Sequence, residues 1–352
     1  MLIRRYLLSV ALLGLTFIAV ISSPAAAADK LQVVTSFSDF AEIARVIGGD
    51  KVSIDFISQG DQDPHFVAPK PSLALKLKKA DIWITTGLDL EMWSTTLLDK
   101  ARNKKIMDGA KGFVTVHNGI ELQQKHETAM TRTEGDIHLY GNPHIHTGPL
   151  NWKKIAENIL IGLIKNDPDS ESYYMDNYTK FCDRLDRQLF GDELVEMIGA
   201  ERLEKLLLSG GFYDLLEKSY RGEPLKKHLG GWLKKAERLR GLKVIAYHKN
   251  WTYFTKTFGL EVVEYVEHKP GIPPTGKHVQ EIANIIAQQN IRLMLVASYF
   301  EHNTPEMIER RTGIKTVSLP FSCKGNDQVP DNFALIDYWL DSMLNALNSS
   351  AQ

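Results

Sequence analysis

The sequence predicts an α/β protein with two parallel-sheet lobes separated by a helical segment. Near both ends of the chain, short apolar runs of strand length alternate with amphipathic runs of helix length, a pattern typical of parallel sheets covered by helices. Between them, apolar residues recur at helical spacing with charges in between. The chain has 352 residues, more than one typical domain, which also favours two lobes.

Residues 1–28 have the layout of a secretory signal peptide. Arg4 and Arg5 precede an apolar stretch from Tyr6 to Val20, and small residues follow up to Ala28. The apolar stretch is shorter than the roughly 20 residues that a membrane-spanning helix needs. No cysteine lies there to carry a lipid anchor. We therefore expect cleavage after Ala28 and a free periplasmic protein.

The first lobe is expected over residues 29–150. Its strands are predicted at 31–37, 52–58, 81–86 and 113–117, and its helices at 38–47, 69–80 and 91–101. Ser38 is expected to cap the first of these helices.

Residues 151–240 are expected to form a helical connector with an insertion. Pro168 should break or kink the helical stretch that runs to about Leu189. Residues 191–240 also have a helical pattern, interrupted by glycines. The basic residues from Lys226 to Arg240 are interpreted as solvated helix faces rather than as a phosphate site.

The second lobe is expected over residues 241–352, where the alternation resumes. Its strands are predicted at 243–247, 261–266, 292–299 and 315–319, and its helices at 251–258, 279–289, 305–311 and 333–347.

Composition excludes some classes of protein. The 42 basic and 43 acidic residues are nearly balanced, so no nucleic-acid surface is indicated and we expect a monomer without nucleic acid. The two cysteines, Cys182 and Cys323, are too few for a disulfide scaffold, and whether they pair is left open.

Three histidines stand where a strand-like or apolar run gives way to a loop. His65 follows the strand ending at residue 58 through a short turn, His248 comes directly after the strand 243–247, and His144 lies between two prolines. Ligands of open parallel sheets bind beyond the carboxyl ends of the strands. A fold that brings these loop ends together would hold a tri-imidazole site, and three neutral imidazoles with one further ligand suit Zn²⁺, with Mn²⁺ possible.

Each histidine also has an ordinary structural interpretation. His65 could cap the following helix, His144 could bond to loop backbone, and His248 could be a satisfied half-buried residue. Further histidines, His126, His138 and His146, could collect metal weakly or be incidental.

Several ordered motifs resemble the zinc- and manganese-binding solute-binding proteins of ABC transporters. The similar segments are Asp63-Pro64-His65, Asn142-Pro143-His144, residues 247–254 and residues 270–275, within a match over about 31–190 and 241–347. The resemblance implies two α/β lobes joined by a long connecting helix, with a metal in the cleft. It places the family's three histidine ligands on His65, His144 and His248.

Two features depart from that family. The loop that commonly supplies an aspartate ligand reads Pro320-Phe321-Ser322-Cys323-Lys324 here and has no acid. Glu301 is the preferred substitute, because its carboxylate would emerge at the same sheet edge, although it could instead be an acid that stabilises the following helix. Cys323, Asp327 or a water are weaker options. The second departure is the helical insertion at 191–240.

These observations predict periplasmic capture of a divalent transition metal, with Zn²⁺ as the expected cargo and Mn²⁺ or iron as the alternatives, and its delivery to an inner-membrane ABC permease. Because imidazoles lose metal when protonated, affinity should fall below about pH 6.5. A zinc hydrolase with Glu301 as general base is the alternative from another class. A binding protein for an organic solute is a third, which Trp251 and Tyr253 keep open.

Overall fold

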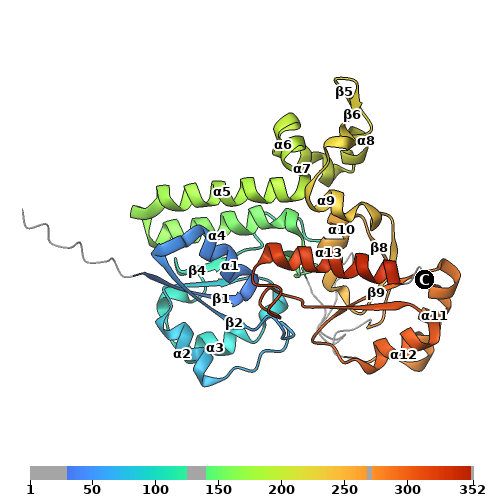
Figure 1. The fold of residues 1–352 in the computed structure, drawn as a ribbon. Coiled ribbons are helices and arrows are strands. Elements are labelled where there is room, and N and C mark those ends of the chain that lie inside the picture. The colour runs from blue at the N-terminus through green and yellow to red at the C-terminus, as the bar shows by residue number, and fades with distance from the viewer. Residues whose placement is uncertain (1–29, 125–139, 268–271, 350–352) are drawn as a thin grey trace, which may run out of the picture.

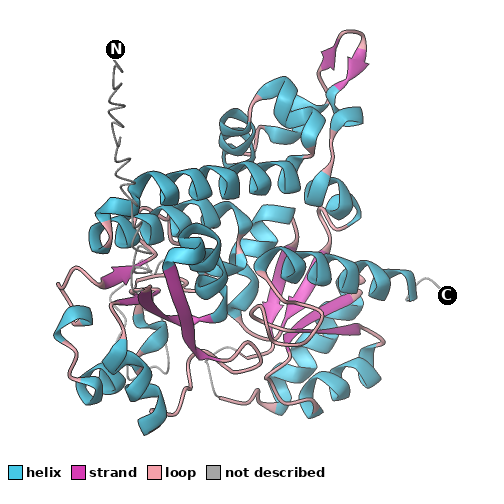
Figure 2. Ribbon diagram, turned by 60° about the vertical axis from the view of Figure 1, so that its left-hand side comes forward, coloured by secondary structure: helices cyan, strands magenta, loops and turns pink. Residues whose placement is uncertain are grey.

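The structure is a computed structural model that describes residues 30–124, 140–267 and 272–349. It contains two four-stranded parallel sheets, ordered β2-β1-β3-β4 and β10-β9-β7-β8, each covered by helices (Figures 1 and 2). The predicted fold class is confirmed. The signal peptide and the histidines His126 and His138 lie outside the described residues. Within those residues, no helix is both long and apolar enough to cross a bilayer.

The first sheet is sandwiched between two layers of helices. Side chains of alternate strand residues point to opposite faces of the sheet. Val33 and Ile82 therefore join one apolar cluster with α1 and with α4 (Trp152–Asn166). Val34 and Trp83 join another cluster with α2 and α3. The elements are β1 (Leu31–Phe37), α1 (Ser38–Gly48), β2 (Val52–Ser58), α2 (Pro71–Lys79), β3 (Ile82–Thr85), α3 (Ser94–Ala101) and β4 (Phe113–Thr115).

The second sheet has the same layered arrangement. Its helices α10 and α13 cover the face turned toward the first lobe, and α11 and α12 cover the other face. The elements are β7 (Lys243–Ala246), α10 (Thr252–Phe258), β8 (Glu261–Tyr265), α11 (Gly276–Gln289), β9 (Leu293–Ala297), α12 (Asn303–Thr312), β10 (Lys315–Leu319) and α13 (Asn332–Ser349).

Two helices form the connector, α4 (Trp152–Asn166) and α5 (Glu171–Phe190), and they lie side by side along the first lobe (Figure 1). The chain breaks between them at Pro168, as predicted, because proline cannot continue the helical hydrogen-bond ladder. A single apolar cluster runs from the first lobe through both connector helices into α13. The lobes therefore share a core rather than meeting across a loose linker.

The insertion projects from the body of the molecule beyond α5 (Figure 1). It is helical, as predicted, except for a small antiparallel hairpin that the sequence analysis missed. Arg221 and Gly222, at φ 52° and 89°, form its two-residue turn. The elements are α6 (Asp192–Ile198), α7 (Ala200–Ser209), α8 (Phe212–Leu216), β5 (Ser219–Tyr220), β6 (Glu223–Pro224) and α9 (Gly231–Lys235).

The lobes touch at a polar junction around the start of α1. The prediction that Ser38 caps α1 is wrong, because the N-cap residue is Phe37 and Ser38 Oγ donates instead to the backbone oxygen of Cys323, at 2.6 Å. The backbone of Gly60 lies so close to Cys323 that a Cβ at residue 60 would come within 2.3 Å of the Cys323 oxygen. Both Cys323 and Cys182 are free thiols.

Candidate metal centre

His65 is held by the turn that follows β2. Its backbone N–H donates to Asp63 Oδ1 at 3.0 Å, and its ring Nδ1 lies 2.7 Å from the same oxygen. Trp93 Nε1 donates to the Pro64 oxygen at 2.8 Å, which holds the turn in place. Because a carboxylate oxygen can only accept, Nδ1 carries the proton and donates this hydrogen bond, so Nε2 is the candidate ligand atom of this ring.

His144 is held by a loop that Asn142 ties to the second lobe. Asn142 Oδ1 accepts from the His144 N–H at 2.9 Å, and Asn142 Nδ2 donates to the Lys249 oxygen at 2.7 Å and to Thr252 Oγ1 at 3.0 Å. Tyr253 donates its hydroxyl to the Asn142 oxygen at 2.6 Å. The His144 ring is buried, and the position of its loop is set by groups of the second lobe.

His248 follows β7 directly and is also buried. Its Nδ1 lies 3.3 Å from Glu267 Oε2, a carboxylate that is itself buried at the end of β8. The Glu267 N–H donates to the Tyr247 oxygen at 2.7 Å, which aligns the ends of the two strands. The sequence analysis did not identify Glu267, although its place beyond a strand next to β7 is a usable signal.

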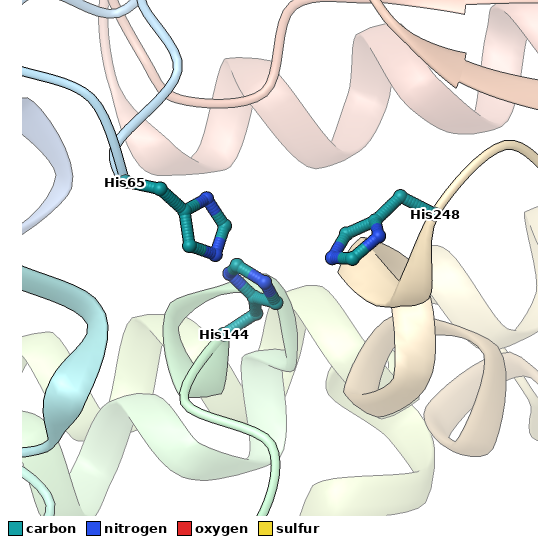
Figure 3. Close-up of side chains that lie close together, drawn as sticks. All are labelled: His65, His144 and His248. Carbon is teal, nitrogen blue, oxygen red and sulfur yellow. The ribbon is translucent and has the colours of Figure 1, made fainter. Parts of the chain in front are cut away.

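The three histidines meet although they come from three distant segments (Figure 3). One nitrogen of each ring lies within 4.8 Å of one nitrogen of the others. The ring centroids are 5.1 Å apart for His65 and His144, and 6.0 and 6.1 Å apart for the pairs with His248. The ring planes are steeply inclined to one another, at 72° to 89°. Three converging neutral imidazoles are a donor set that suits Zn²⁺.

Glu301 does not join this cluster. Its carboxylate accepts from the Asn303 and Thr304 N–H groups at 2.7 and 3.2 Å, at the N-terminus of α12. Burial alone would raise the pKa of Glu301, but the hydrogen bonds from Thr304 and Asn303 outweigh it and lower the pKa. The structure thus gives this acid the helix-stabilising role that the sequence analysis had left as the alternative to ligation.

The weaker candidates for a fourth ligand are also elsewhere. Cys323 is buried at the lobe junction, where burial and then the nearby Asp39 raise the pKa of its thiol well above the usual range. Asp327 is exposed. Among the described residues, the group of His, Cys, Asp and Glu side chains that converge as metal ligands consists of the three histidines. Trp251 and Tyr253 are buried packing residues, which leaves an aromatic site for an organic solute without support.

His146 lies behind His144 in an apolar pocket. Its ring contacts Phe37, Phe40 and Phe321, with centroids 5.5, 6.2 and 5.0 Å away, and neither ring nitrogen has a hydrogen-bond partner. Burial lowers the pKa of His146 to about 3, so the ring is neutral. It does not belong to the converging group, and its surroundings are those of a core residue.

Replacing His146 by Phe should therefore leave metal binding unchanged and stabilise the fold. An unsatisfied buried polar group costs about 1–3 kcal/mol, and a phenyl ring of similar shape removes that cost. Urea unfolding of the metal-free protein measures the gain, and a zinc titration of the same variant measures affinity. A marked loss of zinc affinity would show that His146 takes part in the site.

The fold and the imidazole cluster identify the protein as a bilobal α/β protein with a candidate metal centre between the lobes. The family model of the zinc-uptake complex component A, periplasmic, matches residues 33–200 and 227–347, and the chain belongs to this family. The resemblance to metal-ion solute-binding proteins of ABC transporters is thereby confirmed. Residues 201–226, which include the unpredicted hairpin, fall outside the match.

Relatives and solved structures agree with this membership. The high-affinity zinc uptake system protein ZnuA of Bacillus subtilis (strain 168) is 22% identical over 295 residues, which cover 83% of this chain and 78% of that protein. The manganese ABC transporter substrate-binding lipoprotein PsaA of Streptococcus anginosus is 29% identical over 56% of this chain and 61% of its own length. A crystal structure of ZnuA matches the fold with a TM-score of 0.66 and 20% identity, covering 90% of this chain and 99% of that one.

A structure of a Mn-bound periplasmic metal binding protein from candidatus liberibacter asiaticus has the same fold, with a TM-score of 0.63 and 17% identity over 91% of this chain and all of that one. One of the two named relatives belongs to a zinc uptake system, and the other is the substrate-binding lipoprotein of a manganese ABC transporter. The chain is accordingly a metal-binding solute-binding protein rather than a zinc hydrolase.

Proposed function

We propose that the mature protein captures one Zn²⁺ in the periplasm through His65, His144 and His248 and delivers it to an inner-membrane ABC permease. The observation that carries the proposal is the convergence of three imidazoles, two from the first lobe and one from the second, on a common point. In this proposal the lobes are residues 29–150 and 241–352, residues 151–240 connect them, and the signal peptide 1–28 is removed.

The ligand set favours zinc over manganese. Neutral imidazole suits Zn²⁺, whereas carboxylate and water ligands suit Mn²⁺. No carboxylate of the described part of the chain joins the three histidines, so a water completes the zinc shell in this proposal. The relatives named for manganese make Mn²⁺ the second candidate cargo.

A calorimetric titration of the chelator-stripped protein from residue 29 tests the proposal. We expect one Zn²⁺ per chain, bound much more tightly than Mn²⁺, with the bound metal confirmed by elemental analysis. Size-exclusion chromatography with light scattering should show a monomer before and after loading. Tighter binding of Mn²⁺ would change the cargo, and the absence of tight binding of either metal would refute the proposal.

A further inference from the structure

We infer that Glu267 is a positioning residue of the metal centre, which holds His248 by its Nδ1 and, together with Asp63 on the other lobe, supplies the negative charge that the three ligands lack. This inference rests on the proposed function. It assigns a role to two outer carboxylates, neither of which belongs to the proposed ligand set.

The backbone fixes the position of Glu267 relative to His248. Val266 donates its N–H to the Ala246 oxygen at 3.0 Å and Glu267 donates to the Tyr247 oxygen at 2.7 Å, so the ladder between β7 and β8 continues up to the ligand. The side chain of Glu267 is 6% exposed and that of His248 is 3% exposed. Nδ1 and Glu267 Oε2 are 3.3 Å apart, at ion-pair distance but without hydrogen-bond geometry. In the inference, this buried carboxylate keeps the ring proton on Nδ1, which leaves Nε2 to bind the metal.

The first lobe contains a similar pair, which is closer and is hydrogen-bonded. Asp63 Oδ1 lies 2.7 Å from His65 Nδ1, and the His65 side chain is 3% exposed. Each of these two histidines is therefore oriented by a carboxylate of its own lobe. Such a carboxylate fixes the tautomer, restricts rotation of the ring and raises the electron density on the ligating nitrogen.

The charge balance gives the two carboxylates a second role. Three neutral imidazoles leave both positive charges of Zn²⁺ uncompensated, and a buried charge is costly unless it is paired. Asp63 and Glu267 provide one negative charge each, from opposite sides of the cleft. Their attraction to the ion then stabilises the bound metal.

The test compares two variants, each of which removes the negative charge of one carboxylate that follows a strand of the second sheet. Glu267→Gln should weaken Zn²⁺ binding by about 10- to 100-fold, the usual cost of losing an outer-shell partner of a metal ligand. Glu301→Gln is the matched control, because Glu301 also lies beside Tyr247 but bonds to a helix end, and its Zn²⁺ affinity should equal that of the wild type. Both affinities are measured by competition with a chelator of known zinc affinity.

Nitrogen-15 NMR of the histidine rings gives a readout that a purely structural role would not change. In the zinc-loaded wild type, His65 and His248 should each bind zinc through Nε2 and show a strongly deshielded Nδ1 proton. The His248 proton should move upfield in Glu267→Gln while the His65 proton stays in place. The wild-type spectrum tests the inference even if the variant does not fold.

The outcomes separate the inference from the function on which it rests. A wild type that binds no zinc overturns both. A wild type that binds one zinc, with an unchanged affinity in Glu267→Gln or without the deshielded Nδ1 proton on His248, overturns the role of Glu267 and leaves the proposed function intact.

Discussion

Replacing His248 by Ala is expected to weaken zinc binding by well over about 100-fold, because loss of a ligand should cost more than loss of its outer-shell partner. The variant loses one of three imidazoles and also the ligand that is oriented by the second lobe. The remaining pair, His65 and His144, could not hold the ion across the cleft. We expect the same loss for His65→Ala and His144→Ala.

Calorimetry at neutral pH, with chelator competition for the tightest binders, measures these losses. His302→Ala is a suitable control, since this side chain is exposed and lies outside the converging group. Thermal unfolding of the metal-free variants should show that each is folded. If all three alanine variants bind zinc as the wild type does, the metal site is elsewhere in the molecule.

Local sequence patterns predicted the two lobes because each strand and helix carries its own periodicity. The break at Pro168 was predictable for the same reason, since proline acts on its own backbone. Ser38 was misassigned because a serine at a helix start favours capping, whereas its hydroxyl bonds to Cys323, which is 285 residues away. Contacts over such distances depend on how the lobes meet, which a local pattern does not contain.

The candidate site likewise has features that local patterns predict and features that depend on how distant segments meet. Topology alone placed three histidines at the carboxyl ends of strands or in a leading loop, and the structure brings them together. Topology also placed Glu301 at that edge, whereas the sequence analysis did not consider Glu267, which follows a neighbouring strand. The N–H groups at the start of α12 hold Glu301, while the strand pairing directs Glu267 toward His248. The choice between them is made by backbone hydrogen bonds that the sequence does not display.

Asp39 at the lobe junction should make the stability of the protein depend strongly on pH. Its side chain is buried, with Oδ1 accepting from the Cys323 N–H at 3.4 Å and Oδ2 without a partner. Burial raises the pKa of Asp39 to about 7, opposed by hydrogen bonds from Ser322 and Cys323 and reinforced by the charge of Glu42. Lys324 does not offset this, because its ammonium group pairs with Glu42 at 2.7 Å.

The sign follows from proton binding. The folded state retains the Asp39 proton up to about pH 7, whereas the unfolded chain loses it near the ordinary value of 3.8. The stability associated with this proton is therefore complete below about pH 3.8 and is lost as pH rises through about 7. A shift of about three pKa units corresponds to about 4 kcal/mol.

Asp39→Asn is uncharged at every pH and has nearly the same shape as the protonated acid. Its free energy of unfolding should exceed that of the wild type by about 4 kcal/mol at pH 8, and the difference should shrink toward zero near pH 4. Urea unfolding of both metal-free proteins across this range measures the difference. Subtracting the two curves removes the contribution of Glu91, another buried acid with a raised pKa, because both proteins contain it. A difference that does not change with pH would mean that Asp39 is ionised throughout the range in the folded protein.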